Sequence, residues 1–105
     1  MVCRNIEIPD AGLAEFCRRW KVVELALFGS VLRDDFRPDS DVDVLVTFAE
    51  GARWTLFDMV DMRDELSRVL GRPVDLVSRR GVQRSRNHLR RQAILSSAET
   101  IYVQG

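Results

Sequence analysis

The residues in this sequence that could do chemistry are three aspartates and a Gly-Ser pair. Asp41 and Asp43 are separated by one residue, and Asp75 is the one acidic residue in the otherwise apolar run at 72–77. Neighbouring carboxylates repel each other without a cation, and their hard oxygens suit Mg²⁺, which commonly binds one or two carboxylates together with phosphate oxygens. A charge inside an apolar strand is costly unless it is paired or bound to metal. Asp41 and Asp43 could instead bind nothing, and Asp75 could pair with an arginine, but we expect the three to form a Mg²⁺ site.

A Gly-Ser step precedes the aspartates and could hold a phosphate group. Gly29 and Ser30 follow the apolar, β-branched run at 22–28 and begin a short polar segment. Glycine lets a ligand approach the backbone closely. A helix that starts at Ser30 would also point its free N–H groups and the Ser30 hydroxyl at the same anion. Ser30 could simply cap that helix, but capping and phosphate binding use the same N–H groups, so the two interpretations are compatible.

Two predicted strands position these residues. The runs at 22–28 and 41–48 both have strand character, and the polar segment between them turns the chain back so that the strands can pair antiparallel. Side chains alternate along a strand. Asp41 and Asp43 should therefore lie on one face of the second strand, and the valines at 42, 44 and 46 on the other.

A predicted helix connects the second strand to a third strand at 72–77. Thr55 is a candidate N-cap with Asp58 three residues on, and Gly71 is typical of a helix end. The buried stripe of this helix should be Leu56, Met59, Val60, Leu66, Val69 and Leu70. Because a helix between two strands is typical of a βαβ unit, the second and third strands should be parallel neighbours, which brings Asp75 to the site.

The remaining segments complete a small α/β (α+β) fold. A first helix should begin with Asp10 as its N-cap and bury Cys17, and residues 101–103 could add an edge strand or simply pack. A last helix over 84–98 should turn three residues inward, namely Leu89, Ile94 and Leu95. We expect residues 1–105 to be one domain, with a small mixed β-sheet, helices mainly on one side and the site at its open edge.

Composition limits the classes of function. The chain has 16 Lys and Arg against 16 Asp and Glu, so nucleic acid is not expected as a direct ligand. Seven arginines nevertheless lie between 72 and 91, where they could form a basic patch for a triphosphate, RNA or an acidic partner, or only a solvated helix face. No stretch resembles a signal peptide, and no apolar run approaches the ~20 residues that span a bilayer. We expect a cytoplasmic, reduced protein with no membrane partner.

The arrangement of these motifs resembles the DNA polymerase β-like nucleotidyltransferase superfamily. Its pattern is Gly-Ser, ten residues, Asp-x-Asp and a later strand aspartate. The resemblance is greatest to minimal nucleotidyltransferases (MNT), the antitoxin halves of HEPN/MNT toxin–antitoxin pairs in bacteria and archaea. It rests on the segments 27–34, 40–46 and 71–77, and it extends to 89–91 and 94–98. Asp-x-Asp alone is common by chance, whereas Gly-Ser at this distance between two strand-like runs is specific.

The resemblance implies a polymerase β-like fold and Mg²⁺-dependent transfer of AMP from ATP to a tyrosine hydroxyl of a partner HEPN toxin. Asp41, Asp43 and Asp75 would be the catalytic metal ligands, and Gly29 and Ser30 would hold phosphates. Two other functions stay open. The chain could be an antitoxin that masks its toxin without catalysis, although the three aspartates argue against this. It could also be a free-standing nucleotidyltransferase acting on RNA or a small molecule such as an aminoglycoside, which the small size of the chain disfavours.

Other residues allow two interpretations each. Arg33 is a further candidate phosphate ligand, but ion pairs with the aspartates at 34, 35 and 39 are an equal alternative. Trp54 should lie in or near the core, although Trp54 and Phe57 could border a nucleobase. His88, the one histidine, has no second catalytic candidate near it in sequence, so we expect it at the surface or an interface.

Overall fold

The protein folds around a mixed sheet, as the sequence predicts, and this sheet has four strands. The computed structural model describes residues 2–3, 5–34, 36–37 and 40–104. The elements are β1 (Val2–Cys3), β2 (Ile6–Glu7), α1 (Asp10–Arg19), β3 (Val22–Phe28), the 3₁₀ helix η1 (Gly29–Leu32), β4 (Val42–Phe48), α2 (Leu56–Leu70), β5 (Val74–Ser78), α3 (Arg79–Gln83), α4 (His88–Ser97) and β6 (Glu99–Val103). The sheet order is β5-β4-β3-β6, and β1 and β2 form a separate ribbon.

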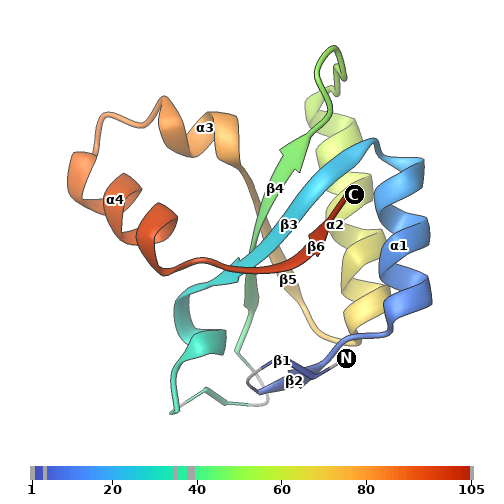
Figure 1. The fold of residues 1–105 in the computed structure, drawn as a ribbon, viewed down its shortest axis with the longest axis horizontal. Coiled ribbons are helices and arrows are strands. Elements are labelled where there is room, and N and C mark those ends of the chain that lie inside the picture. The colour runs from blue at the N-terminus through green and yellow to red at the C-terminus, as the bar shows by residue number, and fades with distance from the viewer. Residues whose placement is uncertain (1, 4, 35, 38–39, 105) are drawn as a thin grey trace.

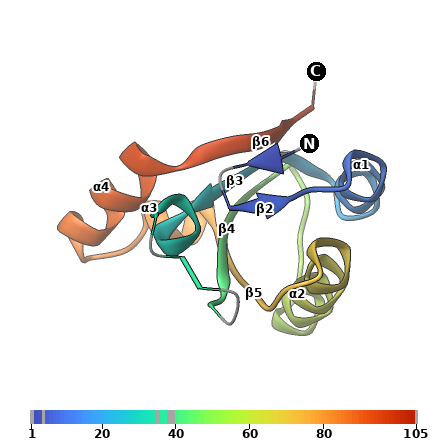
Figure 2. The same ribbon diagram turned by 90° about the horizontal axis from the view of Figure 1, so that it is seen from below.

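Helices lie on both sides of this sheet. Figures 1 and 2 show α1 and α2 on one side of the strands and α3 and α4 on the other. The expectation of helices mainly on one side therefore holds for α1 and α2 only. The difference matters because α3 and α4 cover part of the face that carries the aspartates.

The predicted strand pairings are confirmed. β3 pairs antiparallel with β4, and β4 pairs parallel with β5 through the α2 crossover. β6 pairs antiparallel with β3 at the edge of the sheet, so the C-terminal segment is a strand as well as a packing element. β4 begins at Val42, whose N–H donates to the Pro73 carbonyl at 2.9 Å, so Asp41 stands one residue before the strand rather than at its first position.

Strand alternation divides the interior into two clusters. Val42, Val44 and Val46 are buried against α1 and α2, where the main core lies. On the opposite face, Leu45 and Ile94 belong to a smaller cluster that joins β3 and β4 to α3 and α4. Because Asp43 lies between Val42 and Val44, it shares the face of Leu45 and of the smaller cluster.

α2 has the predicted caps but a different buried face. The Thr55 and Asp58 side chains and backbones form a capping box, and Gly71 ends the helix at φ 70°. The predicted burial of Leu56 and Val60 is wrong, because Met62 is fully buried and at about 100° per residue they lie about 120° and 160° from it around the helix. α2 is the longest described helix at 15 residues, and no described helix is both long and apolar enough to cross a membrane.

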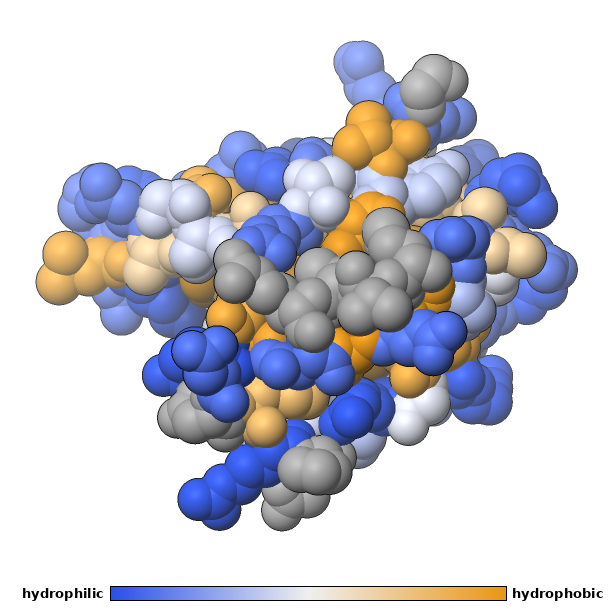
Figure 3. All heavy atoms as spheres, turned by 60° about the horizontal axis from the view of Figure 1, so that its bottom comes forward, coloured by the Kyte–Doolittle hydropathy of each residue, from blue (hydrophilic) through white to orange (hydrophobic). Residues whose placement is uncertain are grey.

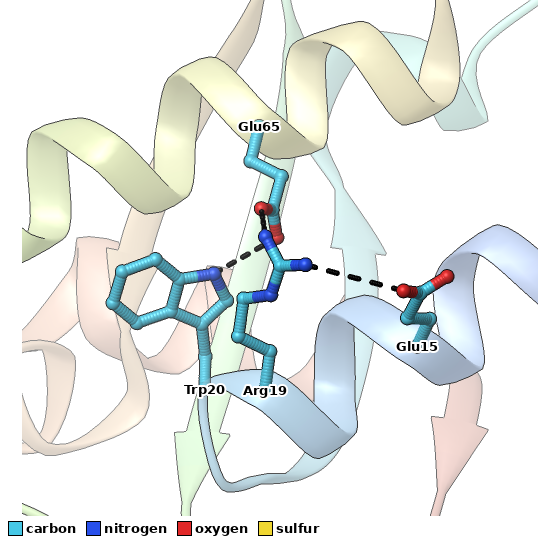
Figure 4. A network of polar contacts seen from close by, with 4 residues as sticks. All are labelled: Glu15, Arg19, Trp20 and Glu65. Atoms are coloured by element: carbon cyan, nitrogen blue, oxygen red, sulfur yellow. Dashed lines mark hydrogen bonds and ion pairs between the residues drawn. The ribbon is translucent and has the colours of Figure 1, made fainter.

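α1 packs beside α2 through both apolar and polar contacts. Cys17 is buried as expected, and burial raises the pKa of its thiol to about 12. Figure 4 shows Arg19 and Trp20 reaching across to Glu65 of α2, with the Trp20 Nε1–H donating to Glu65 Oε2 at 2.9 Å. The prediction of Asp10 as N-cap is wrong by one residue, because Pro9 holds the extended N-cap conformation and its carbonyl accepts the N–H of Leu13.

The expected helix over 84–98 is shorter. Only α4 lies within this range, and α3 ends just before it, at Gln83. The Asn87 side chain caps α4 by accepting the Arg90 N–H at 3.0 Å. Ile94 is buried and Leu95 half-buried, as predicted, but Leu89 is 78% exposed. Figure 3 shows a corresponding apolar area at the left tip of the molecule, over the start of α4.

Gly71, which ends α2, and Gly12, which lies within α1, should respond to alanine in opposite ways. Gly71→Ala should lower the free energy of unfolding by about 1–2 kcal/mol, because its φ is positive. Gly12→Ala should raise it by about 0.5–1 kcal/mol, because Gly12 is helical and a Cβ there would meet Val69 Cγ1 at an ordinary 3.5 Å. Denaturant titration of both variants checks this, and changes of the same sign would contradict the assigned backbone conformations.

Candidate functional site

The sheet brings the predicted aspartates together. Asp43 on β4 and Asp75 on β5 are Cα partners in the parallel ladder, so their side chains emerge next to each other on the same face. Asp41 precedes Asp43 by two residues and lies at the same end of the sheet. On its other side, Asp43 pairs with Phe28, the last residue of β3. The end of β3 and the starts of β4 and β5 therefore meet at the carboxylates.

The Gly-Ser step lies directly against Asp43. Gly29 has φ +74°, and a Cβ placed on it would overlap Asp43 Oδ2. The Ser30 backbone N–H donates a hydrogen bond to the Asp43 carboxylate. Ser30 belongs to the four-residue 3₁₀ helix η1. The sequence had suggested instead that a longer helix starts at Ser30. Only glycine can occupy position 29 in this arrangement, both because of its φ and because of the carboxylate.

The electrostatics of Asp43 reflect this crowding. Burial raises the pKa of the Asp43 carboxyl above its ordinary value, and the negative charges of Asp75 and Asp41 raise it further. The hydrogen bond from Ser30 and the positive charge of Arg90 lower the same pKa and partly offset the rise. A like-charged cluster of this kind is relieved by a cation.

The donor set fits a hard divalent cation that shares its ligands with a phosphate-bearing molecule. Within the described ranges, no three Asp, Glu, His or Cys side chains are arranged to hold a metal ion by themselves. Mg²⁺ commonly takes only one or two carboxylates and fills its other positions with water and phosphate oxygens. The adjacent Asp43 and Asp75, with Asp41 at the same end of the sheet, supply oxygens of the required type.

Asp75 lies in a different environment from the one that the sequence indicated. The apolar run around it suggested a buried strand, but β5 is an edge strand and Asp75 is exposed. The cost of burying a charge therefore says nothing about its role. Its place in the site follows from its register with Asp43.

Arg33, the further candidate phosphate ligand, is not brought to the carboxylates by any contact among the described residues. Arg33 is exposed, and within the described part of the chain no hydrogen bond or ion pair joins its guanidinium to another side chain. The ion pairs considered with Asp35 and Asp39 fall on residues outside the described part. The Asn5 side chain holds the end of η1 in place, because its amide donates to the carbonyls of Val31 and Arg33 at 2.7 and 2.8 Å.

Trp54 and Phe57 do not border the site. They follow the far end of β4, a strand of seven residues, or about 20 Å at about 3.3 Å per residue. Trp54 packs edge-on against Trp20, with ring centroids 5.2 Å apart, and Phe57 is 83% exposed. His88 is exposed, as predicted, with its Nδ1 2.7 Å from Arg91 Nη2.

The arginine-rich segment does not form one basic patch. Arg79 donates to Thr47 and forms an ion pair with Glu24, and Arg72 lies over the ring of Phe36. Among these arginines, Arg90 is the one whose positive charge lowers the pKa of the Asp43 carboxyl. Arg90 is not among the residues that the sequence assigns to the site. Its spacing of four residues before Ile94 is the signal that could have found it, because that spacing puts both on one side of α4, where Ile94 is buried and Arg90 is exposed.

The sequence matches a known family and several curated relatives. Residues 11–101 match the family described as Nucleotidyltransferase domain. The chain is 39% identical over 70 residues to the protein adenylyltransferase MntA of Thermococcus cleftensis, a match that covers 67% of this chain and 69% of that protein. It is 40% identical over 57 residues, or 54% of its length, to a predicted protein adenylyltransferase of Methanocaldococcus jannaschii. Matches to this and a second relative from that organism span 59% and 64% of their lengths.

Solved structures share the fold. A structure described as a candidate minimal nucleotidyltransferase is 40% identical, with a TM-score of 0.63 over 85% of this chain and 84% of that one. A chain from a toxin–antitoxin structure with AMP-PNP has a TM-score of 0.68 at 19% identity and covers 92% of this chain and 75% of its own. A structure of a tri-AMPylated Shewanella oneidensis HEPN toxin with its MNT antitoxin gives 0.59 at 21% identity, with coverage of 90% and 70%. At these low identities the last two show the fold alone.

Position 29 should be far more sensitive to alanine than another glycine with a similar backbone. Gly29 and Gly51 both have positive φ, but a Cβ at Gly51 would meet nothing within 4 Å. Gly51→Ala should cost about 1–2 kcal/mol of unfolding free energy, and Gly29→Ala should cost more because Asp43 must also move. Adding Asp43→Ala to Gly29→Ala should recover part of the loss. Equal losses at both glycines in denaturant titrations would contradict the contact.

The raised pKa of Asp43 predicts how stability depends on pH. The native state binds this proton more tightly than the unfolded chain, in which the pKa is near 3.8. Ionised Asp43 therefore destabilises the native state at neutral pH, and the penalty disappears as the pH falls to the unfolded pKa. Asp43→Asn should melt a few degrees above the wild type at pH 7, with a gap that closes toward pH 4. Asp61→Asn, on the exposed side of α2, controls for the loss of a surface charge, and a less stable Asp43→Asn protein at pH 7 would mark Asp43 as structural.

Proposed function

Because the chain belongs to the Nucleotidyltransferase domain family, we propose that it transfers AMP from ATP to a tyrosine hydroxyl of a HEPN-domain toxin encoded next to it and thereby acts as an antitoxin. The observation that carries this proposal is the pairing of Asp43 with Asp75 on one face of the sheet, with the Gly29-Ser30 backbone against Asp43. The resemblance to protein adenylyltransferases supports the type of acceptor, and the site supports the type of reaction.

The carboxylates would hold Mg²⁺ together with the nucleotide. Asp41 and Asp43 would bind both ions, one of which is also carried by the triphosphate, and Asp75 would bind the other. When bound, such a pair of ions stabilises the attacking and leaving oxygens of an in-line displacement. This assignment agrees with a donor set that lacks a preformed group of three ligands, because phosphate oxygens complete the coordination.

The chain's own groups would position the reactants. The backbone of Gly29 and the hydroxyl of Ser30 would hold the β- and γ-phosphates, while the Ser30 N–H holds Asp43, and the exposed Arg33 follows in the same loop to assist. Asp75, exposed at the edge strand, would orient the acceptor hydroxyl and accept its proton. The acceptor oxygen then bonds to the α-phosphorus, the bond from that phosphorus to the β-phosphate oxygen breaks, and pyrophosphate leaves with the electron pair.

The acceptor would come from another protein. Among the described residues Asp75 lies on the exposed edge strand, which leaves room for an incoming hydroxyl. The reaction consumes ATP, so we place it in the cytoplasm. A toxin whose tyrosine is modified in this way would lose activity, and ATP would be required only for the transfer itself.

Mass measurement of the neighbouring protein tests the proposal. The protein encoded next to this chain should gain the mass of AMP after incubation with this chain, Mg²⁺ and ATP, and each of the four ribonucleoside triphosphates is tried in turn. The double variant Asp41→Asn/Asp43→Asn should give no gain, because it lacks two of the three carboxylates. If the two proteins co-purify but no mass changes, the protein is instead an antitoxin that acts by binding.

A further inference from the structure

α4 brings one arginine onto the face of the sheet that carries the carboxylates. Ile94 of this helix is buried against Phe28 and Leu45 in the smaller core cluster. Phe28 is the strand partner of Asp43, and Leu45 follows Asp43 by two residues on the same face. Arg90 precedes Ile94 by one helical turn and so projects from the same face of α4. The packing of Ile94 therefore aims Arg90 toward the aspartates.

A small cavity lies between α3, α4 and β5, on the side of the sheet that also carries the carboxylates, and none of the three aspartates lines it. Its volume is about 150 Å³, and its wall includes Arg90 and Ile94 from α4 and Val77 from β5. Val77 follows Asp75 by two residues and shares its face of the strand. The positive charge of Arg90 also lowers the pKa of Asp43, which agrees with a guanidinium close to the site.

The guanidinium of Arg90 has no polar partner among the described residues. Within those residues it forms no ion pair and no side-chain hydrogen bond. Its neighbour Arg91 differs, because it donates to the Ser85 carbonyl at 3.3 Å and contacts His88, and so holds the loop between α3 and α4. Arg79 is likewise paired, with Glu24. The three carboxylates repel one another, and Arg90 faces them without forming a direct ion pair. An arginine in this position can bind a further anion.

We propose that Arg90 binds the triphosphate of the nucleotide together with Gly29 and Ser30. This inference rests on the proposed function and adds a residue to it. Arginine offers several N–H donors in a planar fork that matches phosphate oxygens, and it stays protonated throughout. As the bond from the α-phosphorus to the bridging oxygen breaks, negative charge accumulates on the departing pyrophosphate, and the guanidinium would donate hydrogen bonds to it without losing a proton.

Binding of inorganic tripolyphosphate isolates this contact from the base and from the acceptor protein. Calorimetry with Mg²⁺ and tripolyphosphate should show about tenfold or greater weakening for Arg90→Gln, because a charge-assisted hydrogen bond is lost. Arg90→Lys should recover part of the affinity. The matched control Arg84→Gln removes the same charge from an exposed residue at the end of α3 that does not line the cavity. This variant should bind tripolyphosphate as tightly as the wild type does. Melting temperatures confirm that each variant is folded.

Turnover supplies a second readout. In the AMP-transfer assay, Arg90→Gln should lower kcat by about 100-fold, since groups that stabilise developing charge have effects of this size. Tripolyphosphate binding unchanged in Arg90→Gln, or weakened equally in Arg84→Gln, would overturn the role of Arg90 while leaving the proposed function intact. A wild type that binds tripolyphosphate with dependence on Arg90 but transfers no AMP to its neighbour would support the Arg90 contact and overturn the proposed acceptor. A wild type that binds no tripolyphosphate would overturn the Arg90 contact, and the mass measurement would then decide the proposed function by itself.

Discussion

The contact between the Gly29-Ser30 backbone and the Asp43 carboxylate is the constraint on which the site depends. It requires a positive φ and the absence of a side chain at Gly29, and it draws the end of β3 toward the start of β4. The same contact leaves Asp43 half-buried beside two other carboxylates, which raises its pKa. The native state therefore carries an electrostatic penalty that a cation with an attached phosphate can relieve.

The rest of the sheet serves to keep the like charges together. Repulsion alone would separate Asp43 and Asp75, but the β4–β5 ladder places their Cα atoms as partners, and the capped α2 crossover enforces parallel pairing. The valines on the other face of β4 are buried in the main core, so a slip of β4 by one residue would expose them. Hydrophobic burial on one face thus fixes the charges on the other.

The smaller core cluster connects the C-terminal part of the chain to the chemistry. Ile94 packs on the strands beside Asp43, and this packing orients α4 so that Arg90 faces the carboxylates. The site consequently has donors from two directions, the backbone of η1 and the guanidinium of α4, around a group of acceptors. This combination suits a ligand that carries both cations and phosphates, and it is the physical basis for assigning the triphosphate there.

The sequence by itself determined the strands β3 and β4, the capped helix α2 and the roles expected of Gly29, Ser30 and the aspartates, because alternation, caps and glycine conformations are local properties. It did not determine that Asp75 lies on an exposed edge strand, that Leu56 and Leu89 face away from the core, or that the positive charge of Arg90 lowers the pKa of Asp43. Those features depend on which face of a helix meets the sheet and on which strand is outermost. Only the tertiary packing decides them, because residues distant in sequence form the surfaces against which each helix packs.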